Sequence, residues 1–141
     1  KFILANSSGL YSLSLAAGVP VAAANMVPLT SVPVTEKDLF IPKLLKDKAT
    51  GEILSFSEIE KRGLAFATRS EDYDRENLEV LENSPEDIRG LCEEMYEKIE
   101  NQALPSGAKE MQWEFKERFL SHLNDWDVKM KGWFQEQMMF P

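Results

Sequence analysis

The first nine residues constrain the fold of this chain more than any other segment. Phe2–Ala5 is a short apolar run, which is typical of a parallel strand that is covered on both faces. Asn6, Ser7 and Ser8 follow it directly, and side chains of these types cap the amino end of a helix. Gly9 then lets the backbone come close to whatever lies at the turn. The segment therefore predicts a buried strand, a polar turn and the start of a helix.

The following residues complete a unit of strand, helix and strand. Leu10–Ala17 continues the predicted helix, Gly18 ends it, and Pro20–Ala24 is the next predicted strand. We expect the two strands to be parallel neighbours that are joined by a right-handed crossover through the helix. The polar turn then lies at the carboxyl end of a strand. Open α/β sheets bind ligands there, and the N–H groups of a helix start attract phosphate or carboxylate.

Few further strands are predicted for a sheet of this type. Leu78–Leu81 is a candidate third strand, and the chain starts with Lys1 rather than Met. Because a parallel strand is not stable alone, we expect a fragment, either the carboxyl-terminal piece of a larger α/β protein or a domain cut from one. The predicted fold class is α/β: a Rossmann-like half-domain fragment with a small parallel sheet and a helical carboxyl-terminal region.

The charge of the chain limits its partners. Its 141 residues fit one domain, and its formal net charge is −8. Nucleic acids and anionic membranes select basic surfaces, so neither is expected as the main partner. A local anion site stays open, because backbone N–H groups bind phosphate whatever the total charge of the chain.

Cysteine, histidine and apolar segments limit the chemistry and the location. Cys92 is the only cysteine and His122 the only histidine, so we predict no disulfide and no metal site. We interpret Cys92 as an inert, buried thiol on an apolar helix face and His122 as a packing residue. The sequence contains no signal peptide or transmembrane segment, and a cytoplasmic location is the default expectation.

A long segment, Asn25–Gly51, is predicted to be an irregular but ordered loop. Its three prolines exclude a continuous helix, and its apolar residues favour packing on the body of the domain. Lys43, Lys46 and Lys48 make it the most basic part of the chain. The dense charge of Arg69–Asn77 predicts a solvated segment.

Two capping signals predict helices. Ser55 with Glu58 begins a short helix over residues 57–62, and Ser84 with Asp87 begins a long one that runs to about residue 101. Apolar residues at spacings of three and four give the long helix one apolar face. We therefore expect a Rossmann-like domain over residues 1–103 and a helical extension over 104–141, with large aromatic residues at Trp126, Trp133, Phe134 and Phe140.

Five segments of the chain, in order, resemble a known family. They are similar to the carboxyl-terminal, nucleotide-binding half of GT-B-type glycosyltransferases, and above all to an uncharacterised bacterial glycosyltransferase-like family associated with surface polysaccharides. The resemblance covers roughly residues 1–100. The segments that carry it are Phe2–Leu10, Gly18–Val21, Asp38–Lys43, Leu54–Ile59 and Leu81–Ile88, the last leading into Glu94 and Met95.

The resemblance implies a site for a nucleotide-sugar donor, which is a substrate rather than a cofactor. The turn at residues 6–9 would hold the diphosphate of the donor, and the helix start would neutralise its charge. A basic residue is expected near a phosphate, and Lys43 is the candidate. The acceptor-binding half and the segments that bind base and ribose are not found in this sequence. We therefore expect a chain that is inactive alone, and the catalytic residues and the stereochemical outcome stay open.

Other interpretations stay open as well. A Ser-Ser-Gly turn followed by Gly-x-Pro-Val also resembles non-hydrolysing UDP-N-acetylglucosamine 2-epimerases, so a fragment of such an enzyme is one alternative. A non-catalytic α/β interaction module is another, because an open sheet edge and an aromatic tail predict a homodimer. Helix capping alone explains residues 6–9, and a solvated loop explains Lys43. Glu36 and Asp38 fit surface carboxylates better than a general base or contacts to sugar hydroxyls.

Overall fold

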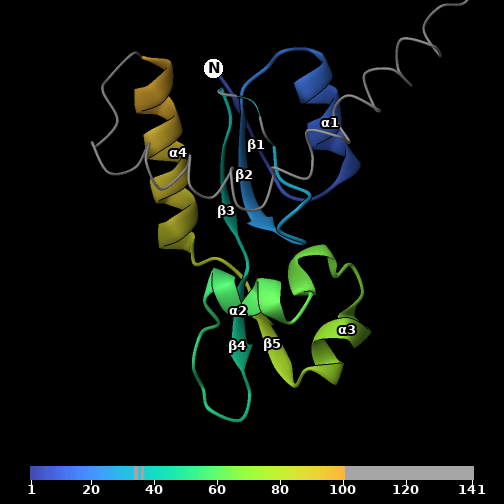
Figure 1. The fold of residues 1–141 in the computed structure, drawn as a ribbon. Helices are drawn as coiled ribbons and strands as arrows, with labels where there is room; N and C mark the ends of the chain where they lie inside the picture. Colours follow the sequence, from blue (N-terminus) through green and yellow to red (C-terminus); the bar gives the residue numbers. More distant parts are fainter. Residues whose placement is uncertain (34, 36, 101–141) are drawn as a thin grey trace, which may run out of the picture. The chain divides into compact units, whose positions relative to one another are not determined.

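The computed structural model describes residues 1–33, 35 and 37–100, which lie in one compact unit spanning Lys1–Pro105. Within this part, the protein is a mixed α/β structure with a three-stranded parallel sheet, a two-stranded antiparallel sheet and helices (Figure 1). The predictions about Glu36, His122, the aromatic residues from Trp126 onward and the helical extension lie outside the described residues.

The first strand, helix and second strand form as the sequence predicts. β1 (Ile3–Ala5) and β2 (Val21–Met26) are parallel neighbours, with Ile3 opposite Val21, and α1 (Gly9–Ala16) connects them. Gly18 follows the helix with a φ of +68°, which a residue with a side chain rarely adopts. The strand–turn–helix–strand unit is thus confirmed.

The third strand of this sheet is not the one expected. β3 (Leu39–Pro42) pairs in parallel with β2, with Leu39 opposite Ala22, and the sheet order is β1-β2-β3. The prediction of an irregular loop over Asn25–Gly51 was therefore wrong for its second half. The prolines exclude a helix but not a strand, because an edge strand tolerates proline, and Pro42 is the last residue of β3.

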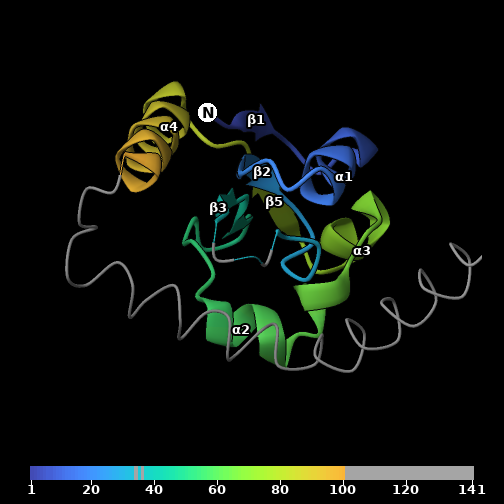
Figure 2. The same cartoon turned by 90° about the horizontal axis from the view of Figure 1, so that it is seen from above.

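Helices lie on both faces of the parallel sheet. α1 packs on β1 and β2, whereas α4 (Pro85–Ile99) packs on β2 and β3, and two perpendicular views place the two helices on opposite sides (Figures 1 and 2). The core beneath α4 consists of apolar residues with little exposed surface, namely Ala22, Ala24, Leu39, Leu91 and Met95. Burial on both faces explains the continuous apolar run of β2.

β1 is less buried than its sequence predicts. The side chain of Leu4 is 47% exposed, and β1 pairs with β2 only on one side within the described residues. Among the described residues β1 is thus an edge strand, and although α1 packs on it, the exposure of Leu4 shows that its apolar run is not fully covered. The expectation of a strand covered on both faces was therefore wrong for β1, and the strand that is buried on both faces is β2.

A smaller sheet follows the parallel one along the chain. β4 (Leu44–Asp47) pairs antiparallel with β5 (Leu78–Leu81), so the candidate third strand is real but belongs to this second sheet. Between them lie α2 (Phe56–Lys61), η1 (Leu64–Phe66) and α3 (Ser70–Arg75). The part of the chain predicted to be solvated is therefore helical in α3. Its one buried residue, Tyr73, donates a hydrogen bond of 2.6 Å to the carbonyl of Ala67.

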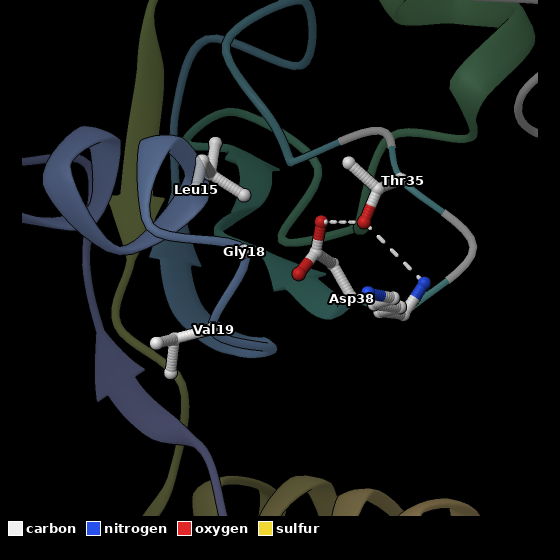
Figure 3. Close-up of a pocket in the computed structure, with 6 residues that line it drawn as sticks. Leu15, Gly18, Val19, Thr35 and Asp38 are labelled. Atoms are coloured by element: carbon white, nitrogen blue, oxygen red, sulfur yellow. Dashed lines mark hydrogen bonds between the residues drawn. The ribbon is translucent and has the colours of Figure 1, made fainter.

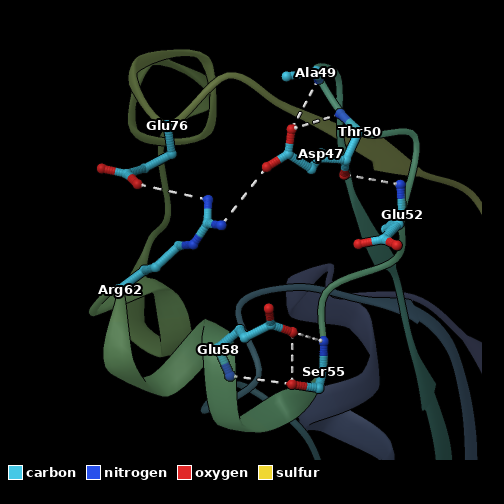
Figure 4. A network of polar contacts seen from close by, with 8 residues as sticks. All are labelled: Asp47, Ala49, Thr50, Glu52, Ser55, Glu58, Arg62 and Glu76. Carbon is cyan, nitrogen blue, oxygen red and sulfur yellow. Dashed lines mark hydrogen bonds and ion pairs between the residues drawn. The ribbon is translucent and has the colours of Figure 1, made fainter.

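Both predicted capping boxes are present. The Ser55 hydroxyl accepts from the N–H of Glu58, and the Glu58 carboxylate accepts from the N–H of Ser55 (Figure 4). Ser84 and Asp87 repeat the arrangement at the start of α4. Hydrogen bonds from the serine hydroxyl and N–H hold the pKa of the Glu58 carboxyl below its ordinary 4.5 and that of Asp87 below 3.8.

A pair of asparagines joins the two sheets. The N–H of Asn25 donates to Oδ1 of Asn83 and the N–H of Asn83 donates to Oδ1 of Asn25, both at 2.6 Å. The Asn83 amide also donates to the carbonyl of Pro42 at 2.8 Å. Asn25 has a φ of +55°, a conformation that asparagine adopts more readily than most residues. These bonds fix the ends of β2 and β3 to the segment between β5 and α4.

The asparagine pair predicts a measurable loss of stability on truncation. Asn83→Ala removes two side-chain hydrogen bonds and leaves partly buried backbone groups of Asn25 and Pro42 without partners, so the free energy of unfolding should fall by about 2 kcal/mol. Asn6→Ala is the control, because Asn6 is exposed. Urea unfolding followed by circular dichroism measures both. Equal stability of the two variants would contradict the structural role of Asn83.

The capping carboxylate of α4 predicts a specific acid dependence. Because folding lowers the pKa of Asp87, its contribution to stability is present above the unfolded value of 3.8 and is lost as the pH falls through the folded value. As the pH decreases below about 4, the free energy of unfolding of Asp87→Asn should therefore decrease less than that of the wild type. Glu86→Gln removes a neighbouring carboxylate of the same first turn and is the control. Identical acid profiles for wild type and Asp87→Asn would exclude this contribution.

Candidate functional site

The three parallel strands end at one edge of their sheet, which we call the carboxyl edge. β1 ends at Ala5, β2 at Met26 and β3 at Pro42. The predicted site residues follow the two outer strands directly, at residues 6–9 and at Lys43. Since β2 lies between these strands, the two groups are separated by about 10 Å, two strand spacings. The fold thus brings Lys43 to the same edge as the polar turn.

The turn at residues 6–9 exposes its polar groups. Asn6, Ser7, Ser8 and Gly9 are all exposed, and the Ser8 N–H donates to the carbonyl of Asn6 at 2.7 Å. Ser8 is the N-cap of α1, but its side chain makes no capping hydrogen bond. The expectation of side-chain capping was therefore wrong at this helix. A helix start leaves N–H groups without intrahelical partners, and the first turn of α1 holds no acidic residue.

Gly9 has no structural requirement within the described residues. Its φ is not positive, and a Cβ added there would meet no atom within 4 Å. Glycine in a helix costs about 0.5–1 kcal/mol relative to alanine. By contrast, Gly18 and Gly63 need glycine because their φ angles are +68° and +70°. The space next to Gly9 is therefore open, and neither the backbone conformation nor the packing of the described residues requires a glycine at this position.

Lys43 is held firmly at the carboxyl edge. Its N–H donates to the carbonyl of Met26 at 3.0 Å, and its side chain is 20% exposed. The ammonium group forms an ion pair of 2.5 Å with Glu82, whose side chain is 67% exposed. The structure thus places a largely buried lysine at the same sheet edge as the polar turn and gives it an exposed carboxylate as partner.

A pocket lies at the opposite edge of the parallel sheet, where β2 and β3 begin. Its volume is about 360 Å³, and Figure 3 shows it between the end of α1 and the segment before β3. The residues that line it are Leu15, Gly18, Val19, Thr35, Lys37 and Asp38. Sequence reasoning directed attention to the other edge and missed this pocket, since none of these residues forms a recognisable motif.

Asp38 is a buried structural residue rather than a surface carboxylate. It is 5% exposed, its Oδ1 accepts from the N–H of Val21 at 2.8 Å, and its Oδ2 accepts from the hydroxyl of Thr35 at 2.5 Å (Figure 3). Lys98 donates to its carbonyl at 3.3 Å. The surface interpretation was thus wrong. Because both carboxylate oxygens bind neighbouring segments, Asp38 fixes the start of β2 and fits no role as a general base.

A second polar network belongs to the turn after β4. The N–H groups of Ala49 and Thr50 donate to Asp47 and hold the pKa of its carboxyl below the ordinary 3.8 (Figure 4). Arg62 lies 3.6 Å from Asp47 and 4.0 Å from Glu76. These groups satisfy one another and connect the turn to α2 and to the residue after α3, so the network stabilises the smaller sheet.

The described part of the chain contains neither a metal-binding cluster nor a membrane-spanning helix. Among residues 1–33, 35 and 37–100, no three histidine, cysteine or acidic side chains gather where a metal ion could bind. Cys92 of α4 is only partly buried, so the prediction of a buried thiol was wrong, and it has no disulfide partner among the described residues. No helix in these ranges is long and apolar enough to cross a membrane.

Comparisons with known proteins add no identification. Searches against models of protein families, against curated proteins and against solved structures find no match to this chain.

Proposed function

We propose that this chain binds the diphosphate of a nucleotide-sugar at the carboxyl edge, as the donor-binding part of a glycosyltransferase-like protein. In this proposal the parallel sheet, with α1 and α4 on its two faces, is part of a Rossmann-like domain. The turn at residues 6–9 receives the phosphates, and Lys43 supplies positive charge from the end of β3.

The observation that supports the proposal most is that the turn at the start of α1 has exposed polar side chains and makes no side-chain capping hydrogen bond from Ser8. Its hydroxyl and amide side chains are exposed, the Ser8 side chain does not cap its helix, and Gly9 leaves space that the fold does not need. The N–H groups and the dipole of a helix start favour an anion. Each hydrogen bond to a charged phosphate would contribute about 1.5–3 kcal/mol.

The charge around the turn is compatible with an anion despite the net charge of −8. The first turn of α1 contains no acidic residue, whereas α3 and α4 begin with two each. A negative ligand at α1 therefore avoids the repulsion that it would meet at the other two helices.

The proposal assigns binding and no catalytic step. The donor contact would be the same in a fragment of a nucleotide-sugar 2-epimerase, so the carboxyl edge supports both activities equally. We assign no catalytic role to Asp38, because both of its carboxylate oxygens accept hydrogen bonds within the fold. The polar turn is assigned a binding role alone.

Binding is tested with UDP-, GDP- and CMP-sugars by calorimetry or ligand-observed NMR. Ser8→Asp should weaken binding by at least about tenfold, because its carboxylate lies where the phosphates would bind. Aspartate is itself a good N-cap, so α1 is retained. Ser70→Asp makes the same change at an exposed serine that begins α3 and should bind like the wild type. No binding at millimolar concentrations would reject the proposal.

A second property, self-association, is favoured by the open edge of β1. We propose that two copies pair through the backbone of β1 in a two-fold dimer, which brings the exposed Leu4 side chains of the two copies close together. Leu4→Lys should then shift the protein toward the monomer in light scattering at tens of micromolar. Leu13→Lys changes a leucine of α1 that is 68% exposed and should not. A wild-type mass of 16.1 kDa under these conditions would exclude the dimer.

A further inference from the structure

We propose that the Glu82 carboxylate neutralises the Lys43 ammonium in the ligand-free protein, and that an anionic ligand bound at the carboxyl edge replaces Glu82 as the partner of this lysine. This inference rests on the proposed phosphate site. The ligand class it defines is a polyanionic phosphate, such as a diphosphate, that competes with a carboxylate for the lysine.

The two partners of this ion pair differ in their freedom to move. Lys43 follows β3 directly, its N–H is bonded to Met26, and its side chain is largely buried. Glu82 exposes 67% of its side chain to solvent, and the Lys43 ammonium is the partner that the structure gives its carboxylate. The backbone of the lysine is therefore fixed and its side chain has little room to move, whereas the glutamate can rotate into water at little cost.

Asn83 keeps the pair at the edge of the parallel sheet. It follows Glu82 in the chain, and its side chain bonds both Asn25 of β2 and Pro42, the residue before Lys43. The same hydrogen bonds that join the two sheets therefore place lysine and glutamate opposite each other. The pair is part of the fold at this edge rather than an accidental surface contact.

The chemistry of the competition favours a phosphate. A phosphate group carries up to two negative charges and three strong acceptor oxygens, whereas Glu82 offers a single charge. A ligand that also bonds the start of α1 gains contacts that the glutamate cannot make. A weak anion such as chloride has neither advantage and leaves the pair closed, so the pair selects for multiply charged ligands.

The chain contains a matched control for this pair. Lys46 and Glu79 form an ion pair of 3.5 Å between β4 and β5, with side chains 37% and 50% exposed. They lie within the antiparallel sheet rather than at the end of a parallel strand. Substitutions there change the net charge by the same amount without touching the carboxyl edge.

The test measures the affinity for inorganic pyrophosphate and for UDP by calorimetry. Glu82→Gln removes the competitor and should tighten binding by roughly two- to fivefold, the range expected for one exposed ion pair. Lys43→Met should weaken binding by about tenfold or more. The double variant that carries both Lys43→Met and Glu82→Gln should bind with the same affinity as Lys43→Met alone. Glu79→Gln and Lys46→Met should stay close to wild type.

The outcomes separate this inference from the proposed function. If the wild type binds and Ser8→Asp abolishes binding, but Glu82→Gln matches Glu79→Gln, the counter-ion role is wrong and the site stands. A higher affinity of the double variant than of Lys43→Met also contradicts the counter-ion role, because Glu82→Gln would then raise the affinity without acting through the lysine. If neither wild type nor Glu82→Gln binds pyrophosphate or UDP, both proposals fail. Thermal unfolding of every variant verifies that the fold is retained.

Discussion

The reciprocal hydrogen bonds between Asn25 and Asn83 join the parallel sheet to the antiparallel one. The two residues are 58 positions apart, so their pairing closes a long loop and is costly in chain entropy. In return, each asparagine satisfies the backbone N–H of the other, and Asn83 adds the carbonyl of Pro42. Two sheets that differ in strand direction are thereby held at one junction, where β3 passes into β4 through a single residue.

The same junction sets the geometry of the proposed site. Lys43 is the single residue between the strands, and its position follows from its bond to Met26 and from the Asn83 contact to Pro42. At the opposite edge of the sheet, Asp38 performs a comparable task by fixing the start of β2. The described part of the sheet is therefore fixed by polar side chains at both edges, and the carboxyl edge also carries the exposed side chains of Asn6, Ser7 and Ser8.

The sequence predicted those elements whose signals are local. The polar turn between two apolar runs identified β1, α1 and β2, and serine paired with an acidic residue three positions later identified α2 and α4. β3 and β4 were missed because they follow several prolines and become strands only by pairing with distant segments. The roles of Asp38 and Asn83 were missed for the same reason, since their partners are remote in sequence. The site residues came from a local motif and a resemblance, and the fold adds their common edge.

Amide NMR of the full chain, titrated with UDP, tests whether the carboxyl edge binds the nucleotide. A site at the carboxyl edge predicts that the largest shifts occur at Ser8, Gly9 and Lys43, while Val19 and Asp38 at the opposite pocket stay unchanged. Shifts concentrated around Val19 and Asp38, with none at the turn that begins α1, would contradict the account.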